Sequence, residues 1–184
     1  MGNSPGTPNT SPTPRPPPRR PAVPPPLDRQ ESRGGGYAHR IRRARPDDYD
    51  NLIGIVDNWW GRAAVHNLPR MFLDHFHRTS LLACDDAGIS GFLVGFGSPS
   101  DPYTAHIHFV AVRPDARKSG LGRTLYEAFF TIARSDNRTR VTAITSPTNY
   151  TSIDFHRSLG FTVTGPIPNY NGPGRSLITF TRPV

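Results

Sequence analysis

Residues 110–123 read Val110-Ala111-Val112-Arg113-Pro114-Asp115-Ala116-Arg117-Lys118-Ser119-Gly120-Leu121-Gly122-Arg123. An apolar strand is followed by a short basic loop, two glycines and the start of an amphipathic helix. Free backbone N–H groups at a helix start bind anions with help from the helix dipole, and glycine lets an anion approach the backbone. The segment therefore predicts a phosphate-binding turn. It is neither a P-loop nor a dinucleotide-binding fingerprint, because neither glycine pattern is present.

The flanking sequence predicts an α/β domain with one mixed sheet and helices on its faces. Alternating or apolar runs predict strands over residues 40–42, 79–85, 89–97, 104–112, 140–145, 161–164 and 176–181. Helical spacing and capping residues predict helices after Pro46 and over residues 68–76, 120–134 and 149–159. The element order is therefore β-α-α-β-β-β-α-β-α-β-β.

Composition divides the chain into two parts. Of the 21 prolines, 11 precede Gly34, and residues 1–36 contain too little apolar surface to offset the entropy of ordering. We therefore predict a disordered, Pro/Arg-rich tail over residues 1–36 and one folded domain over residues 37–184. No apolar leader or 18-residue apolar run occurs, which predicts no membrane association, and the single cysteine, Cys84, fits a reducing cytoplasm.

A second motif follows one strand after the first and reads Asn149-Tyr150-Thr151-Ser152-Ile153-Asp154-Phe155-His156-Arg157-Ser158-Leu159-Gly160-Phe161. The first segment resembles the Arg/Gln-x-x-Gly-x-Gly/Ala signature of the GNAT N-acetyltransferase superfamily. The second resembles that family's Asn-x-x-(small)-x-x-Phe-Tyr-x-x-x-Gly-Phe helix, and the element order matches from Arg40 to Thr181. The resemblance implies the GNAT acyl-CoA N-acyltransferase fold. It also implies transfer of an acetyl or other acyl group from acetyl-CoA, or another acyl-CoA, to a primary amine of a small molecule or protein.

The resemblance also implies where the cofactor binds. The pyrophosphate of CoA would contact the backbone amides of residues 118–123, and pantetheine would pair with residues 110–112 as an added strand does. In the family the sheet splays open there, partly through a bulge, and an N–H of Val110 or Ala111 would polarise the thioester carbonyl. Asn149 would contact the pantetheine arm. The implied cofactor site comprises Val110, Ala111, Val112, Arg117, Lys118, Ser119, Gly120, Leu121, Gly122, Arg123, Asn149 and Ser152, and we assign no metal ligand.

Direct attack on a thioester needs a neutral amine, a polarised carbonyl and a proton for the leaving thiolate. Relatives usually carry a tyrosine acid where this chain has His156, on the same helix face as Asn149 and Ser152. His156 is an acid only if its pKa is raised; otherwise it hydrogen-bonds the sulfur or simply packs as a structural histidine.

The general base is harder to assign from the sequence. His106 and His108 share the side-chain parity of Val110, and some relatives carry a glutamate base at the position of His106. A structural role for both histidines fits equally well. Asp101, Asp154 or a chain of waters would also serve.

Acceptor sites in this family are built by the first helices and the loop between the last strands, which implies Trp59, Trp60, Arg62 and Tyr170 as substrate-binding residues. Aromatic surface with few carboxylates favours a small amine of apolar or anionic character, although at least one tryptophan would also suit the core. The acceptor stays open, as does the choice between a monomer and a homodimer.

Two other functions remain alternatives. The net charge of +8 and the Arg-rich tail suggest RNA as a partner, with acyl transfer from aminoacyl-tRNA. The histidine at position 156 and the lack of a clear glutamate base suggest a non-catalytic acyl-CoA-binding module.

Overall fold

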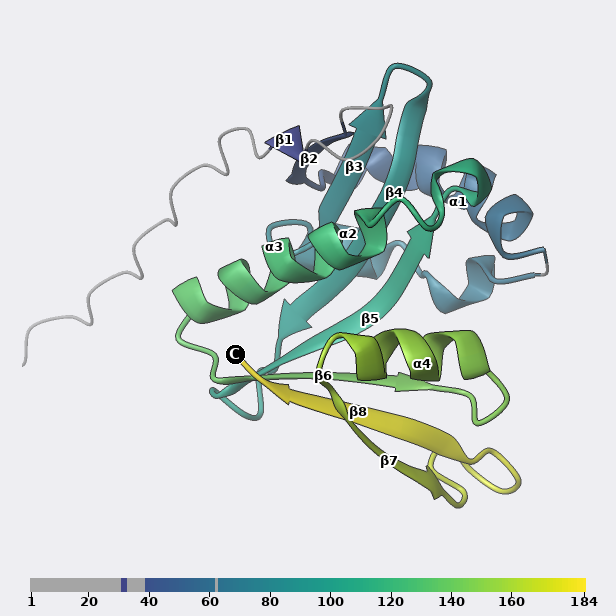
Figure 1. Cartoon of the computed structure of the whole chain (residues 1–184), viewed down its shortest axis with the longest axis vertical. Helices are drawn as coiled ribbons and strands as arrows, with labels where there is room; N and C mark the ends of the chain where they lie inside the picture. Colours follow the sequence, from purple (N-terminus) through teal and green to yellow (C-terminus); the bar gives the residue numbers. More distant parts are fainter. Residues whose placement is uncertain (1–30, 33–38, 62) are drawn as a thin grey trace, which may run out of the picture.

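The computed structural model describes residues 31–32, 39–61 and 63–184 (Figure 1). Most of the predicted tail, and Tyr37 where the folded part was predicted to begin, lie outside these residues. The division of the chain into tail and domain therefore stays a prediction. Glu31–Ser32, inside the predicted tail, form a two-residue strand that pairs with residues 39–40.

One mixed sheet organises the molecule, in the strand order β1-β2-β3-β4-β5-β6-β8-β7. All neighbouring strands are antiparallel except β5 and β6, which run parallel. The strands are β1 (Glu31–Ser32), β2 (His39–Arg43), β3 (Leu81–Asp85), β4 (Gly88–Gly97), β5 (Thr104–Val112), β6 (Arg140–Thr145), β7 (Thr162–Ile167) and β8 (Leu177–Pro183). Strands β2 to β8 confirm the predicted fold class and element order, and β1 is an addition.

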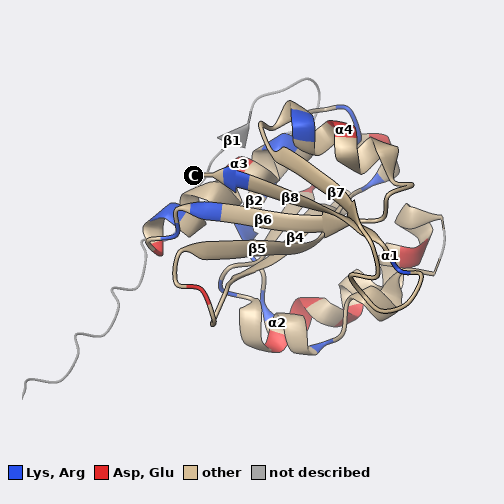
Figure 2. Ribbon diagram, turned by 90° about the horizontal axis from the view of Figure 1, so that it is seen from below, with Lys and Arg blue, Asp and Glu red and all other residues tan. Residues whose placement is uncertain are grey.

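Helices cover both faces of the sheet (Figure 2). They are the 3₁₀ turns η1 (Pro46–Asp48), η2 (Val65–Asn67) and η3 (Pro114–Ala116), and the α-helices α1 (Tyr49–Trp60), α2 (Met71–Phe76), α3 (Leu121–Ser135) and α4 (Tyr150–Ser158). Helices α1 and α2 share one buried core with their face of the sheet, and α3 and α4 share the other. We call these the α1–α2 face and the α3–α4 face.

The helix boundaries follow from local chemistry. In α1, Leu52, Val56 and Trp59 recur at helical spacing and are buried, and the helix ends at Gly61 with φ 65°. Glycine suits that position because the left-handed conformation penalises a Cβ atom. Helix α3 likewise buries its predicted apolar stripe, from Leu121 to Phe129.

Strands β5 and β6 separate partway along their length. Their pairing runs from Thr104 opposite Arg140 to Ile107 opposite Ala143 and then stops, although β5 continues to Val112. Beyond this point the two strands diverge (Figure 1). The opening leaves one edge of residues 108–112 without a neighbouring strand among the described residues. At about 3.3 Å per residue, this free edge is roughly 15 Å long.

Candidate active site

A β-bulge at His108 marks the base of the opening. On β4, Val94 pairs with Phe109 and the next residue, Gly95, pairs with Ile107, so His108 is an extra residue in β5. The bulge reverses the alternation of side chains, because an inserted residue shifts the pleat by one position. Ile107 accordingly packs in the core of the α3–α4 face, whereas Phe109 packs in the core of the α1–α2 face.

This reversal corrects one sequence expectation. His106 and His108 were expected to share the side-chain parity of Val110. In the structure, Val110 packs against the α3–α4 core, whereas His106 and His108 contact aromatic rings of the α1–α2 face. The expectation assumed an unbroken strand, and the bulge separates the two histidines from Val110.

The predicted phosphate turn is open at the start of α3. Lys118 has φ 65° and Gly120 has φ 92°, and a Cβ atom added at Gly120 would meet nothing within 4 Å. Within the described part of the chain, no hydrogen-bond acceptor pairs with the backbone N–H groups of residues 118, 119, 120, 122 or 123. These exposed N–H groups, next to the positive end of a helix dipole, form an anion-binding concavity.

The two arginine side chains of the turn already donate hydrogen bonds to backbone carbonyls of the protein. Arg117 donates from Nε to the Val112 carbonyl at 3.2 Å and from a terminal nitrogen to the Trp59 carbonyl. Arg123 donates to the Ser158 carbonyl at 3.1 Å, which ties α3 to α4. Backbone dipoles and the exposed Lys118 are therefore the groups of this turn best placed to receive an anion.

Gly122 and Asn149 shape the junction between α3 and α4. A Cβ atom at Gly122 would lie 3.3 Å from the Phe155 ring, so this glycine permits close helix packing. The Asn149 side chain accepts from the Ser152 N–H at 3.3 Å and donates to Thr145 Oγ1 at 3.0 Å. Asn149 thus caps α4, and its predicted contact with pantetheine stays a prediction.

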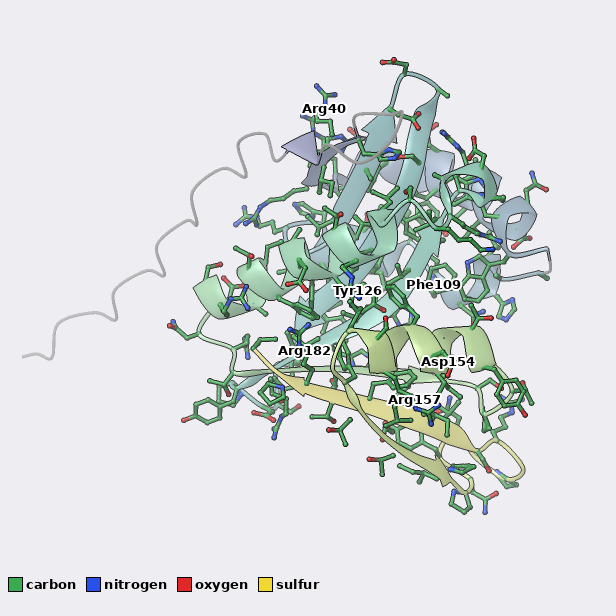
Figure 3. All side chains as sticks on the ribbon, in the orientation of Figure 1. Arg40, Phe109, Tyr126, Asp154, Arg157 and Arg182 are labelled. Carbon is green, nitrogen blue, oxygen red and sulfur yellow. The ribbon has the colours of Figure 1, made fainter. Side chains whose placement is uncertain are left out.

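His156 is buried, which argues against the imidazolium acid, one of the three roles that the sequence left open. Its side chain is on the predicted face of α4, but only 4% of the residue is exposed. Nδ1 lies 2.7 Å from the Ser152 carbonyl and therefore donates, so Nε2 accepts from the Tyr126 hydroxyl at 3.0 Å. Tyr126 projects from α3 toward α4 (Figure 3).

The surroundings of His156 also favour the uncharged form of its ring. The ring stacks on Phe180 with centroids 3.8 Å apart. Burial lowers the pKa of His156 to about 4, although the bond to the Ser152 carbonyl opposes this shift. The imidazole is therefore neutral near pH 7, and both of its nitrogens are engaged. The packed structural histidine is the alternative that the structure supports.

His106 and His108 are half-buried on the α1–α2 face. His108 donates from Nε2 to the Asn67 carbonyl at 2.7 Å and stacks on Phe72 at 3.9 Å, which leaves Nδ1 as its unprotonated nitrogen. Burial lowers the pKa of His108. His106 lies 3.0 Å from Thr142 Oγ1, and burial, with a smaller effect of His108, lowers its pKa to about 4. Both rings are neutral near pH 7.

The residues predicted to bind the acceptor differ in how exposed they are. Trp59 is only 8% exposed and belongs to the core, which corrects its assignment as a substrate-binding residue. Trp60 is half-buried and stacks on Phe109, with ring centroids 4.7 Å apart, beside the free edge of β5. Tyr170 is 50% exposed in the loop before β8. Arg62 lies outside the described residues.

Sequence reasoning missed several residues that support the site. Asp85 lies on β3 with a side chain that is 2% exposed, and it accepts two hydrogen bonds from Arg113 at 2.7 and 3.1 Å. Arg113 is the residue before η3, so this pair fixes the start of the phosphate turn. Asn67 and Tyr126 were missed as well. Their partners are 41 and 30 residues away, and no local pattern signals such contacts.

An opened sheet edge that ends at a glycine-rich helix start defines a site for an extended, phosphorylated carrier. The sequence profile described as "Acetyltransferase (GNAT) family" matches residues 34–161. The chain therefore belongs to the GNAT acetyltransferase family, and it is an acetyl-CoA-dependent N-acetyltransferase of amines. Within the described residues, no helix has the length and apolar composition needed to cross a membrane.

Named relatives agree with this assignment. The chain is 33% identical to an L-methionine sulfoximine/L-methionine sulfone acetyltransferase of Pseudomonas aeruginosa, over 65% of this chain and 74% of that protein. It is 30% identical to the N-terminal acetyltransferase B complex catalytic subunit naa20 of Schizosaccharomyces pombe, over 42% of this chain and 44% of that subunit.

A solved structure with bound ligands has the same fold. It is the diaminobutyrate acetyltransferase EctA of Paenibacillus lautus, in complex with L-2,4-diaminobutyric acid and coenzyme A. It superimposes with a TM-score of 0.64 over 79% of this chain and 95% of that one, at 19% identity.

Proposed function

We propose that the chain acetylates the α-amine of a small amino acid, with acetyl-CoA as donor. The observation that carries the proposal is the free edge of β5, which joins the open phosphate turn to the wall formed by Trp60 and His108. An extended carrier anchored at the turn would present its thioester near the bulge. The relative that acts on methionine sulfoximine supports a small amino-acid acceptor.

The charges of residues 49–76, the segment that carries Trp60 of the acceptor wall, favour an acceptor that is not a polycation. Between Tyr49 and Phe76 the carboxylates are Asp50, Asp57 and Asp74, and each already has a partner. Two backbone N–H groups, of Ala64 and Val65, lower the pKa of Asp57. The described wall thus offers aromatic surface in place of unpaired negative charge, which suits the neutral amine that the reaction requires.

Backbone groups of β5 would polarise the thioester carbonyl, because an N–H aimed at the developing oxyanion stabilises it without reorganisation. His108 would accept the amine proton at Nδ1, directly or through water, and His106 is the second candidate. A lowered pKa makes each imidazole a weak base, so we propose that they relay the proton rather than hold it. With His156 neutral, the proton of the leaving thiolate would come from the attacking nitrogen or from water.

A thiol-release assay tests this function. The panel would contain methionine, methionine sulfone, a diamine, an aminoglycoside and a peptide with a free N-terminus. We expect turnover with the amino acids and slow or no turnover with the polycations. His108→Gln should lower kcat at least tenfold, because general base catalysis contributes about 10²–10⁴-fold. His75→Gln, on the exposed side of α2, is the matched control and should behave as wild type.

Absence of turnover with the amino acids of the panel would refute the proposal. Preference for the peptide would instead favour a protein α-amine as acceptor, in line with the naa20 relative.

A further inference from the structure

We infer that Arg117 is a positioning residue for the acceptor site: it joins the acceptor wall to the cofactor strand and sets the affinity for the acceptor rather than for acetyl-CoA. The inference rests on the proposed function. It assigns to the first residue of the phosphate-turn motif a role different from anion binding. The argument starts from the two carbonyl groups that this side chain contacts.

The guanidinium of Arg117 bridges two chain segments that are far apart in the sequence. Nε donates to the carbonyl of Val112, the last residue of β5, and a terminal nitrogen donates to the carbonyl of Trp59 in the last turn of α1. The last four carbonyls of a helix have no partner within the helix, and a cation there also interacts favourably with the helix dipole. Arg117 therefore binds the end of α1 to the end of the cofactor strand.

The chain beyond α1 is fixed in a second series of contacts. Asp57, in the last turns of α1, accepts from the N–H groups of Ala64 and Val65 at 2.7 and 2.8 Å, which fixes the start of η2. Residue Asn67, at the end of η2, accepts from His108 at 2.7 Å. The segment from α1 to η2 is thus held to β5 at both ends, by Arg117 near Val112 and by His108 at the bulge.

Trp60 lies between these two anchors and stacks on Phe109 of β5. Its indole is half-buried against the strand proposed to carry the cofactor, so a shift of Trp60 would change the surroundings of the proposed acceptor. Loss of the Arg117 contact would loosen the end of α1 that carries Trp60, although Trp59 stays in the core and Trp60 keeps its stacking on Phe109. The phosphate turn would keep its internal contacts, in which Ser119 Oγ donates to the Ala116 carbonyl and accepts from the Leu121 N–H.

Arginine is required for this role because its planar guanidinium carries several donors in fixed directions, whereas lysine is a single point charge. Lys and Arg are equivalent only where charge alone matters. Arg117→Lys therefore separates the two interpretations: it preserves attraction to a phosphate but not the bridge between two carbonyls.

Steady-state kinetics on the full-length protein tests the inference. Arg117→Ala and Arg117→Lys should both raise the KM of the acceptor about tenfold, as expected from hydrogen bonds to a charged donor. The KM of acetyl-CoA should change less than about threefold. Lys118→Ala, which removes the same unit of charge one residue later, should show the reverse pattern. Asp57→Ala, which loosens η2 far from the turn, should resemble the Arg117 variants.

Tryptophan fluorescence provides a readout that needs no activity. The only two tryptophans of the chain are Trp59 and Trp60, next to the carbonyl that Arg117 contacts. Acrylamide should quench Arg117→Ala and Arg117→Lys more strongly than wild type, whereas Lys118→Ala should be quenched as wild type.

Three results would overturn the inference: an increased KM for acetyl-CoA alone or for both substrates equally, recovery of wild-type kinetics in Arg117→Lys, or unchanged quenching in both Arg117 variants. Absence of acetyl transfer by wild type would refute the proposed function separately, and the quenching data would still decide the role of Arg117.

Discussion

Replacement of His156 by glutamine should remove a large part of the acid sensitivity of the fold. Burial lowers the pKa of His156 from about 6.5 to about 4, so the unfolded chain takes up this proton before the folded chain does. The free energy of unfolding is therefore fully present above about pH 6.5 and falls as the pH decreases toward 4. Between pH 7 and pH 4.5, two-state linkage for these pKa values gives a loss of about 2 kcal/mol from this residue.

Urea unfolding of wild type and His156→Gln at pH 7 and pH 4.5 measures this difference. His106 also has a pKa near 4, but it is present in both proteins and cancels from the comparison. The acid-induced loss should be about 2 kcal/mol smaller in the variant. The variant will be less stable at pH 7, because it loses the stacking of the ring on Phe180. An acid-induced loss equal to that of wild type would refute the reasoning.

Activity of the same variant separates a structural histidine from a catalytic acid. A lost general acid lowers the rate by about 10²–10⁴-fold. Both nitrogens of His156 are engaged by Ser152 and Tyr126, so kcat of folded His156→Gln at pH 7 should fall less than about tenfold. A hundredfold loss in a protein shown to be folded by circular dichroism would restore the acid interpretation.

Three further predictions concern pH and packing. Because burial lowers the pKa values of His106, His108 and His156, kcat/KM should rise between pH 6 and 8 with the fraction of neutral amine; a fall that follows a pKa near 6.5 would contradict this. Asp85→Asn should lower the free energy of unfolding in urea by about 1.5–3 kcal/mol and raise the KM of acetyl-CoA, since Arg113 loses its charged hydrogen bonds to Asp85. If neither the free energy of unfolding nor the KM of acetyl-CoA changes, the Asp85–Arg113 pair does not hold the phosphate turn. Gly122→Val should lower the melting temperature more than Gly122→Ala, since the first added Cβ atom already lies 3.3 Å from the Phe155 ring; equal melting temperatures would contradict this.

Features encoded by neighbouring residues were predictable from the sequence. Strands 104–112 and 140–145 have the predicted bounds, because turn residues on either side mark where each begins and ends. The phosphate turn was predictable for the same reason: a strand, a basic loop and two glycines follow one another directly. Gly120 adopts a left-handed conformation that glycine favours, so this part of the turn was predictable from the residue type alone.

Features encoded by distant partners were not predictable. The family resemblance implied a bulge beside the cofactor strand, but its position at His108 depends on the register of β4 against β5, and residues 104–112 by themselves fit an uninterrupted strand. The environment of His156 depends on Tyr126 from α3 and on Phe180 from β8. Helical spacing correctly predicted the face of α4 that carries His156. It gave no information on whether that face is exposed to the cofactor site or packs inward.

The distribution of charge in the site explains why backbone dipoles are central to its chemistry. The histidines proposed for catalysis are held neutral by burial, and Arg117 and Arg123 are bonded to carbonyls. Within the described residues, the free edge of β5, the unpaired N–H groups of the turn and the exposed Lys118 are therefore the main electrostatic elements available to a thioester carrier. Because these groups are fixed before the substrate arrives, they stabilise developing negative charge without reorganisation. We therefore expect acetyl transfer by this chain to depend more on the shape of the opened sheet than on an acid at position 156.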